Sequence, residues 1–400
     1  MDVPDNEGRS PLHWAAYKGH SDCIRLLVFL DARVGLVDKE MCTPLHWAAI
    51  RGNGEACNIL VQASPDQLKC RDSTGSTPAM LAAEKKHYYL SQHLSSKLGT
   101  HARKERSKDR FLFRLILKYE MLPLLIGMIF GLLYGFVKTT FFDGIDDLTM
   151  ALAAWSYVTF ISVSVGFYFL YRVSSTNPGY IQTKVQTKQT DSDDIEASLL
   201  SNNILDSPAL VNGNWNQLCS TCRVIRPLRA KHCSTCDRCV ECFDHHCPWV
   251  GNCVGKANRR DFFMFLALMF VAMISSQGVA MARLYHGGHR GLTWTGDMLS
   301  TFIFSILNGS LLLSVSVLTF IQGNQITRNV TTNEMANSHR YKYLQGPQGQ
   351  FYNPFDEGSC NNFYRIMSGS DLKQKEPLVL TESMKKPAEM EMHCRSCRED

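Results

Sequence analysis

Residues 219–253 read CSTCRVIRPLRAKHCSTCDRCVECFDHHCPWVGNC, and this stretch decides how the rest of the chain is interpreted. Thiolate and imidazole groups are the usual ligands of tetrahedral zinc, and cysteines three positions apart reach one ion from a tight turn. Two closed sites need eight ligands, whereas the stretch offers eleven: Cys219, Cys222, Cys233, Cys236, Cys239, Cys242, Cys247, Cys253, His232, His245 and His246. The spacing predicts zinc with three ligands left over and does not decide which three.

The placement of the cysteines indicates a reducing compartment. Eight of the fifteen lie in this stretch, and none lies between Arg71 and Leu218 or between Val254 and Ser359. A disulfide scaffold would spread its cysteines through an exported domain, whereas clustered cysteines in the cytosol favour metal binding. We therefore expect a cytosolic zinc module, with a disulfide framework as the weaker alternative.

One of these thiols has neighbours suited to nucleophilic chemistry. Cys247 follows His245 by two positions, and Asp244 precedes that histidine. A thiol needs a base or a cation nearby to become a thiolate, and a carboxylate can fix the tautomer of that base. A Cys–His–Asp set suits acyl transfer through a thioester. The alternative is a structural zinc finger that only binds partners.

Four long apolar segments flank the module, at about 121–137, 150–171, 262–284 and 301–321. Each is close to the ~20 residues with which a helix crosses the bilayer core. The polar start of the chain, Met1-Asp2-Val3-Pro4, predicts no N-terminal signal peptide. We expect an all-α membrane protein with four transmembrane helices.

Positive charges predict the topology of these helices. The net charge is only +5, and Lys and Arg gather beside apolar segments instead of forming a nucleic-acid stripe. They lie before the first segment, before the third and after the fourth, at Arg110, Arg114, Lys118, Lys256, Arg259, Arg260, Arg328, Arg340 and Lys342. By the positive-inside rule, both termini and the 172–261 loop are cytosolic. No nucleic-acid partner is expected.

The N-terminal hundred residues contain a repeat. Ser10-Pro11-Leu12-His13-Trp14-Ala15-Ala16 recurs from Thr43 and, more loosely, from Thr77, at the ankyrin period. Ser or Thr with Pro begins a helix, the paired alanines allow close packing, and a glycine ends the helix. We predict three repeats, in an array that has lost units upstream or leans on another surface, and assign no catalysis to His13 or His46. Residues 182–210 read as a flexible linker and the tail after residue 368 as disordered, with Cys394 and Cys397 as exposed thiols.

The stretch from Arg226 resembles a known family. The run Arg226-Pro227-Leu228-Arg229, His232-Cys233, Cys236, Cys239, Asp244-His245-His246-Cys247-Pro248-Trp249 and Asn252-Cys253-Val254-Gly255 is similar to the DHHC protein S-acyltransferases. Repeats ahead of four spans are most similar to its plant ankyrin-repeat members. The resemblance covers about residues 5–365.

The resemblance implies which of these residues bind zinc and which take part in catalysis. It assigns one structural zinc to Cys219, Cys222, His232 and Cys239, and a second to Cys233, Cys236, His246 and Cys253. It makes Cys247 the nucleophile, His245 its base and Asp244 the group that orients His245. Cys242 is outside the family motif and is expected to be a bystander thiol or a minor acylation site.

The resemblance also implies the reaction and its partners. A protein-cysteine S-palmitoyltransferase takes a long-chain acyl group from palmitoyl-CoA onto Cys247 and passes it to membrane-proximal cysteines of protein substrates. The repeats are expected to recruit those substrates, and the family favours the Golgi membrane, with the plasma membrane second. Arg223, Arg226, Arg229 and Lys231 are candidates to bind the CoA phosphates or to face lipid headgroups.

Two later motifs fit the same family. Thr331-Thr332-x-Glu334 matches a TTxE motif that braces the active site, and Asn353-Pro354-Phe355-Asp356 resembles a motif that packs against the spans. One departure is Asn177-Pro178-Gly179, where the family has Asp, which puts a capping role of that acid in doubt.

The expected boundaries are 1–100 for the repeats, 101–171 for a basic linker with two helices, and 172–261 for the cytosolic linker and zinc module. Residues 262–321 hold two more helices, 322–366 the packing motifs and 367–400 the tail. Two other function classes remain open: a non-catalytic membrane adapter and, more weakly, a zinc-dependent ubiquitin ligase.

Overall fold

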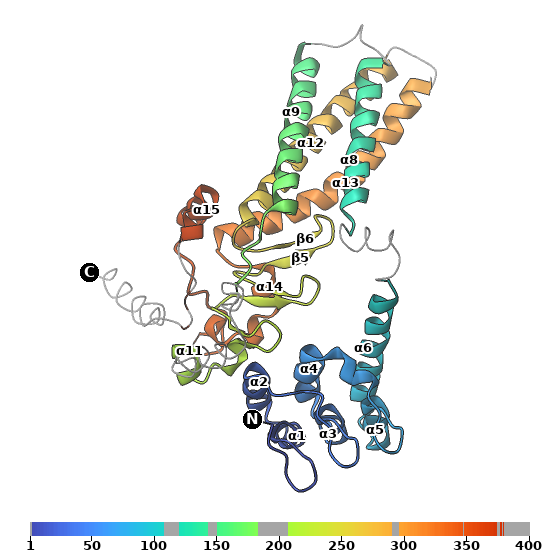
Figure 1. Cartoon of the computed structure of the whole chain (residues 1–400). Coiled ribbons are helices and arrows are strands. Elements are labelled where there is room, and N and C mark those ends of the chain that lie inside the picture. Colours follow the sequence, from blue (N-terminus) through green and yellow to red (C-terminus); the bar gives the residue numbers. More distant parts are fainter. Residues whose placement is uncertain are drawn as a thin grey trace, which may run out of the picture. The chain divides into compact units, whose positions relative to one another are not determined.

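The computed structural model describes residues 2–107, 120–142, 150–182, 207–289, 296–346, 348–373, 377 and 379. The chain divides into two compact units, and Figure 1 labels helices and strands of both. The first comprises Met1–Leu117, Ile181–Cys239 and Pro377–Val379, and the second comprises Lys118–Tyr180, Val240–Glu376 and Leu380–Asp400. Most of the predicted linker and tail, including Cys394 and Cys397, lies outside the described residues.

Three helix pairs form the N-terminal array of the first unit. Gly19 takes the left-handed conformation (φ 75°) directly after the first helix, as the helix-ending role requires. The core between the pairs consists of small and aliphatic side chains such as Ala16, Leu45 and Leu60, each fully buried. The pairs are α1 (Pro11–Lys18) with α2 (Ser21–Phe29), α3 (Pro44–Ile50) with α4 (Gly54–Ala63), and α5 (Pro78–Glu84) with α6 (Tyr88–Ser107).

The two repeat histidines help to start their helices. Nδ1 of His13 accepts from the backbone N–H of Ser10 (3.0 Å), and Nε2 lies 3.1 Å from the carbonyl oxygen of Cys42. His46 makes the same contacts with Thr43 and with the carbonyl of Ser76. Burial lowers the pKa of both histidines. They are neutral structural groups, as their place in the repeat predicts.

The first unit also holds the beginning of the cysteine module. Here α11 (Pro208–Val211) and the paired strands β1 (Leu218–Cys219) and β2 (Val224–Ile225) lie against α2 of the array. The contact is apolar, with Phe29, Leu210 and Leu218 all buried in one cluster. An ion pair between Arg223 and Asp31 adds a polar contact between the module and the array.

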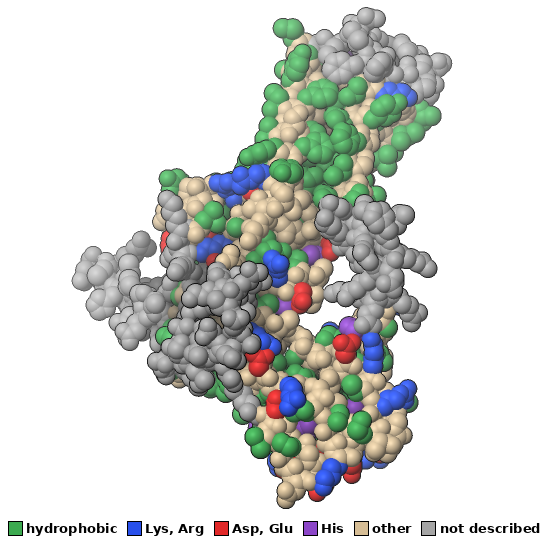
Figure 2. Space-filling model, viewed as in Figure 1, with side chains coloured by type: hydrophobic (Ala, Val, Ile, Leu, Met, Phe, Trp, Pro, Cys, Tyr) green, Lys and Arg blue, Asp and Glu red, His purple; other side chains and the backbone are tan. Residues whose placement is uncertain are grey.

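Within the part of the chain that the structure describes, four helices of the second unit are long and apolar enough to cross a membrane. Many apolar side chains on them are exposed, for example Tyr134, Leu313 and Phe320. Figure 2 shows many hydrophobic side chains on the face of these helices that is in view. Burying them in lipid resolves that exposure. The helices are α8 (Leu122–Val137, continued by a π-helical turn over Lys138–Phe142), α9 (Met150–Ser175), α12 (Arg259–His289) and α13 (Gly296–Thr327). The prediction of a four-span helical membrane protein is confirmed.

Segments after α13 fold back on its end. A short helix, α14 (Thr332–Ala336), follows directly, and α15 (Ser359–Ser368) packs against α13. Asn353 donates to the carbonyl of Arg328 (2.6 Å), and Asn329 donates to the carbonyl of Phe355 (2.9 Å). The motif from Asn353 to Asp356 therefore packs against the end of a span in this chain.

Candidate active site and metal centres

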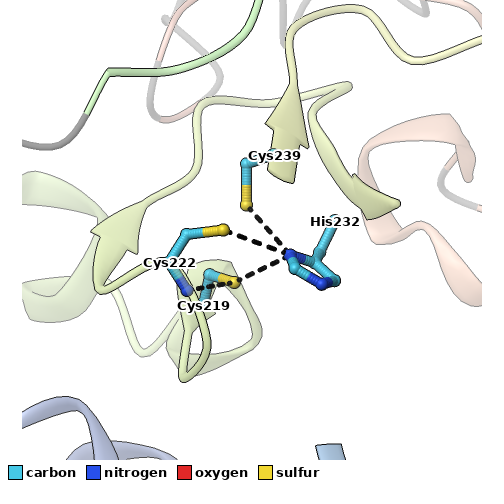
Figure 3. Close-up of side chains that lie close together, drawn as sticks. All are labelled: Cys219, Cys222, His232 and Cys239. Carbon is cyan, nitrogen blue, oxygen red and sulfur yellow. Dashed lines mark hydrogen bonds between the residues drawn. The ribbon is translucent and has the colours of Figure 1, made fainter. Parts of the chain in front are cut away.

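The first predicted ligand set converges in the first unit. Strands β1 and β2 pair antiparallel, and the turn between them brings Cys222 beside Cys219. His232 and Cys239 come from β3 (Lys231–Cys233) and β4 (Arg238–Val240), which form a second two-stranded sheet. The ligand atoms of all four residues lie within 4.8 Å of one another (Figure 3).

The geometry around His232 fits a zinc ion. Its Nδ1 faces the three sulfurs, at 3.2 Å from Cys222, 3.6 Å from Cys219 and 3.9 Å from Cys239. Its Nε2 points the other way, 3.5 Å from a carboxylate oxygen of Asp237. Hydrogen bonds from Cys222 and Cys239 lower the pKa of Cys219, which favours the thiolate that zinc binds. Three sulfurs and one imidazole nitrogen form a closed tetrahedral donor set.

The second predicted set is divided between the two units. In the first unit, the backbone N–H of Cys236 donates to the sulfur of Cys233 (3.5 Å). In the second unit, Nδ1 of His246 lies 3.5 Å from the sulfur of Cys253. Each pair has the spacing of ligands to one ion. Their union on a single ion stays a prediction.

In the hairpin that carries the DHHC sequence, successive side chains alternate between its two faces. Strand β5 (His245–Cys247) pairs antiparallel with β6 (Asn252–Val254), and His246 lies directly opposite Cys253. Because successive side chains of a strand point to opposite faces, His245 and Cys247 share the face away from that pair. One face of the hairpin thus offers metal ligands, and the other offers a thiol beside an imidazole.

Asp244 and His245 form a short charged hydrogen bond. Nδ1 of His245 lies 2.6 Å from Oδ2 of Asp244, whose carboxylate is 1% exposed. Burial opposes a charge on His245, but its hydrogen bonds to Asp244 and Cys247 and their negative charges raise its pKa to about 9. Burial raises the pKa of Asp244, but the hydrogen bonds that its carboxylate accepts from His245 and from the N–H of Thr332 lower that pKa overall.

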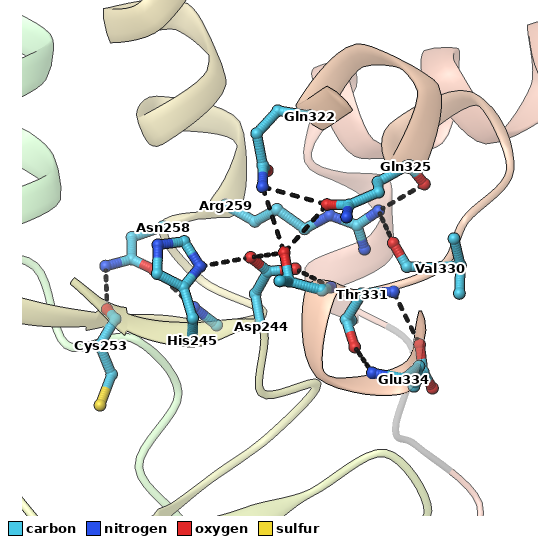
Figure 4. Close-up of polar contacts among 12 residues, drawn as sticks. Asp244, His245, Cys253, Asn258, Arg259, Gln322, Gln325, Val330, Thr331 and Glu334 are labelled. Carbon is cyan, nitrogen blue, oxygen red and sulfur yellow. Dashed lines mark hydrogen bonds and ion pairs between the residues drawn. The ribbon is translucent and has the colours of Figure 1, made fainter. Parts of the chain in front are cut away.

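The TTxE motif reaches the same carboxylate. Thr331 and Glu334 form a reciprocal capping box that starts α14, with bonds of 3.1 and 2.8 Å. That cap presents Thr332 to Asp244: its backbone N–H donates to Oδ1 (2.7 Å) and its hydroxyl lies 2.9 Å from Oδ2. The motif therefore fixes Asp244, and Asp244 fixes His245 (Figure 4).

Three further residues complete this polar network. Arg259, 2% exposed, donates to the backbone carbonyls of Gln325 (3.2 Å) and Val330 (3.5 Å). The Gln322 amide donates to the side-chain oxygen of Gln325 and to the hydroxyl of Thr332, at 3.0 and 3.3 Å. Sequence reasoning used Arg259 only as a topological charge and did not single out the glutamines. Polar side chains at the end of an apolar span were the available signal.

Cys247 lies at the edge of an apolar cluster that continues among the membrane helices. It is 6% exposed and belongs to the same cluster as Val250 and Val254 of the hairpin and Phe262 and Met269 of α12. Partly buried side chains of α8 line the same cluster. The Phe262 ring also meets the His245 ring edge-on, with centroids 5.3 Å apart. Cys242 is fully buried, with its sulfur 4.0 Å from Arg259.

Asparagines join the hairpin to α9. The amide of Asn252 donates to the carbonyls of Val173 (3.0 Å) and Thr176 (2.9 Å), at the end of that helix, where carbonyls have no partner within the helix. Asn177, which replaces the family's Asp, accepts from the backbone N–H groups of Gly179 and Tyr180 at 3.0 and 2.8 Å. Its neutral amide oxygen therefore still organises the turn.

The basic residues predicted to meet CoA have protein partners in the first unit. Arg223 pairs with Asp31, and Arg226 donates to the carbonyls of Gln217 and Asn216. Arg229 is 5% exposed and has a left-handed backbone (φ 67°). Lys231 begins β3. Their contact with phosphate stays a prediction.

The sequence of this chain matches two family models. One, described as DHHC palmitoyltransferase, matches residues 213–339, and one for ankyrin repeats in three copies matches residues 12–105. The prediction of three ankyrin repeats ahead of a DHHC domain is confirmed.

Curated relatives match this chain over different shares of its length. The chain is 38% identical over 374 residues to the probable protein S-acyltransferase 23 of Arabidopsis thaliana, covering 90% of this chain and 68% of that protein. It is 30% identical over 419 residues to palmitoyltransferase ZDHHC17 of Mus musculus, covering 88% and 64%. The match to palmitoyltransferase ZDHHC5 of Canis lupus familiaris, 36% identical, covers 38% of this chain and 20% of that protein. The chain thus spans about two thirds of the length of the first two relatives.

Proposed function

This chain belongs to the DHHC palmitoyltransferase family of multi-pass membrane protein S-acyltransferases, and from that premise we propose that Cys247 carries the acyl group as a thioester. The observation that supports this role is the 2.6 Å bond between Asp244 and His245, on the hairpin face that also carries Cys247. A purely structural zinc finger has no need of that buried charged pair.

In the proposed first half-reaction, His245 accepts the proton of Cys247. Asp244 occupies Nδ1, so Nε2 is the nitrogen that exchanges the proton. The raised pKa of His245 favours the imidazolium–thiolate pair. The thiolate attacks the carbonyl carbon of acyl-CoA, the C–S bond to CoA breaks, and the CoA sulfur takes the proton from His245.

In the second half-reaction, a cysteine thiol of the protein substrate gives its proton to His245 and attacks the Cys247 thioester. The acyl group moves to the substrate, and the proton then returns to Cys247. His245 is therefore base and acid in turn. Long-chain acyl-CoA, palmitoyl-CoA in particular, is the proposed co-substrate.

The apolar cluster around Cys247 supports a long-chain donor. Cys247 belongs to the same apolar cluster as side chains of α8, α9 and α12. An acyl tail bound along these helices gains about 0.8 kcal/mol for each methylene removed from water. The reactive carbonyl stays at the hairpin. The contact of Arg223 and Arg226 with CoA phosphates would require both to exchange their present partners.

Zinc would hold the hairpins in place and take no part in acyl transfer. We propose Cys219, Cys222, His232 and Cys239 as ligands of one ion, and Cys233, Cys236, His246 and Cys253 as ligands of a second. When bound, each ion supplies a tetrahedral crosslink between short strands that have little core of their own.

We also propose that the repeats recruit protein substrates. Arg9, His13, Trp14, Tyr17 and Trp47 line an open hollow of about 190 Å³ on the first two repeats. Such a cluster of aromatic and cationic side chains is typical of protein-binding surfaces. A Golgi location with both termini in the cytosol completes the proposal.

Labelling with palmitoyl-CoA tests the role of Cys247. Purified wild-type protein should acquire a hydroxylamine-sensitive label, and C247S should lose it. C242S is the matched control, because Cys242 is also buried and lies five positions away; it should keep the label. A full label on C247S would refute the assignment.

A further inference from the structure

Glu120 makes a contact with the second predicted metal set that the motif reading does not include. Its two carboxylate oxygens lie 2.9 and 3.1 Å from Nε2 of His246. The side chains are only 18% and 15% exposed. The other ring nitrogen, Nδ1, faces the sulfur of Cys253. The two residues in contact are 126 positions apart in the chain.

The backbone at this point is also fastened to the hairpin. Glu120 has a left-handed conformation (φ 48°), which is uncommon for a residue other than glycine, Asn or Asp. The next N–H, of Met121, donates to the carbonyl of Pro248 (2.9 Å), one residue after Cys247. Helix α8 begins at Leu122. Two hydrogen bonds thus fasten the chain to the hairpin directly before this membrane helix begins.

We propose that Glu120 is a positioning residue for His246, acting as the carboxylate partner of a metal-binding imidazole. This inference rests on the proposed function, in which His246 is a zinc ligand. By accepting the Nε2–H, Glu120 selects the tautomer whose Nδ1 lone pair faces Cys253, and it orients the ring. Second partners of this kind raise the basicity of the ligand, and their loss costs about 10- to 100-fold in metal affinity.

The first metal set offers a contrast in the same chain. Asp237 lies near Nε2 of His232, but at 3.5 Å and with a side chain that is 74% exposed. Water screens such a contact, so its contribution is small. The Glu120 contact is shorter and largely shielded. It also has a consequence that Asp237 lacks, because it ties the entrance of α8 to the hairpin carrying Cys247.

The experiment compares release of zinc from wild-type protein with two variants of nearly equal side-chain length. Full-length protein in detergent is challenged with excess chelator, and zinc is followed with a colorimetric indicator. We expect two ions per wild-type chain. E120M, without an acceptor, should release one ion at least tenfold faster. E120Q keeps an acceptor oxygen, so its rate of zinc release should lie between those of the wild type and E120M. E241M is the control, since Glu241 pairs with Lys256 and touches no zinc histidine.

The outcomes distinguish the role of Glu120 from the role of His246 as a zinc ligand. Wild-type release kinetics in both E120M and E120Q, while H246A loses an ion, would overturn the role of Glu120 and leave the ligand assignment intact. Retention of both ions by H246A would overturn the ligand assignment, and this inference with it. Should E120M fail to fold, a graded loss in E120Q relative to E241M still decides the question.

Discussion

Asp244 is the residue on which the polar network of this site converges. Three donors reach its carboxylate: Nδ1 of His245 and both the N–H and the hydroxyl of Thr332. The buried guanidinium of Arg259 also lowers its pKa. A buried carboxylate held this way stays ionised and cannot rotate. The orientation of His245 is therefore determined from outside the DHHC hairpin, by a segment 88 positions further along the chain.

Replacing Thr332 tests this dependence. T332V removes the hydroxyl donor and keeps the backbone donor, and a hydrogen bond to a charged group contributes about 1.5–3 kcal/mol. We expect the autoacylation rate to fall by roughly 10- to 100-fold, measured with labelled palmitoyl-CoA at unchanged zinc content. T332S keeps the hydroxyl and should stay near wild type. Equal rates for T332V and wild type would show that the hydroxyl does not matter.

For single residues, the sequence predicted which residues form the site better than it predicted the contacts that they make. The Cys/His spacing and the family motif brought out Asp244, His245 and Cys247. The TTxE motif of the family brought out Thr331 and Glu334. Glu120 and Gln325 were not predicted, because their contacts depend on how distant segments meet, and a single acid before a span carries no pattern of its own.

At the scale of elements, short structures rely on side-chain caps. Helices α1 and α3 each carry in their first turn a histidine that accepts a backbone hydrogen bond through Nδ1. The hairpin β5–β6 in turn supplies Asn252 to the end of α9. Hydropathy predicted the four spans but not their full lengths. Helix α12 begins at Arg259, before the apolar stretch, because the polar residues there bond within the protein.

The repeat histidines predict a pH dependence for the array. Burial lowers the folded-state pKa of His13 and His46 below the ordinary value of about 6.5. The unfolded chain therefore binds more protons than the folded one below that value, so stability is highest above pH 6.5 and is lost on acidification. We expect the array to melt at a lower temperature at pH 5.5 than at pH 7.5.

The double variant H13Q/H46Q is the control for this pH effect. Glutamine can still accept at this position of a capping box but does not titrate. Its melting temperature, followed by intrinsic tryptophan fluorescence of the full chain, should change less with pH than that of the wild type. An equal pH response in both proteins would assign the effect to other groups.

At the scale of the whole molecule, the repeats and the beginning of the zinc module form one compact unit. The family resemblance predicted both parts and gave no information about contact between them. Phe29, Leu210 and Leu218 are buried together, whereas the Asp31–Arg223 pair beside them is about half exposed. Burial of a phenylalanine contributes several kcal/mol, and an exposed ion pair contributes about 0–1 kcal/mol. The apolar contact therefore dominates.

Two variants of α2 test that ranking. F29A should increase hydrogen exchange in residues 207–226, because it leaves Leu210 and Leu218 without their partner. D31N, two positions away, should leave exchange there nearly unchanged. A larger effect from D31N than from F29A would reverse the ranking. Unchanged exchange in both variants would show that the array and the module are independent.

In the proposed reaction, the acyl group passes through Cys247 on its way to the protein substrate. The most direct measurement is a single-turnover chase. Enzyme loaded with labelled palmitoyl-CoA is freed of donor, its label is mapped by peptide mass spectrometry, and a cysteine-containing acceptor protein is added. We expect label on Cys247 that decays at the rate at which labelled acceptor appears. Label on another residue, or acceptor labelling only while acyl-CoA is present, would contradict it.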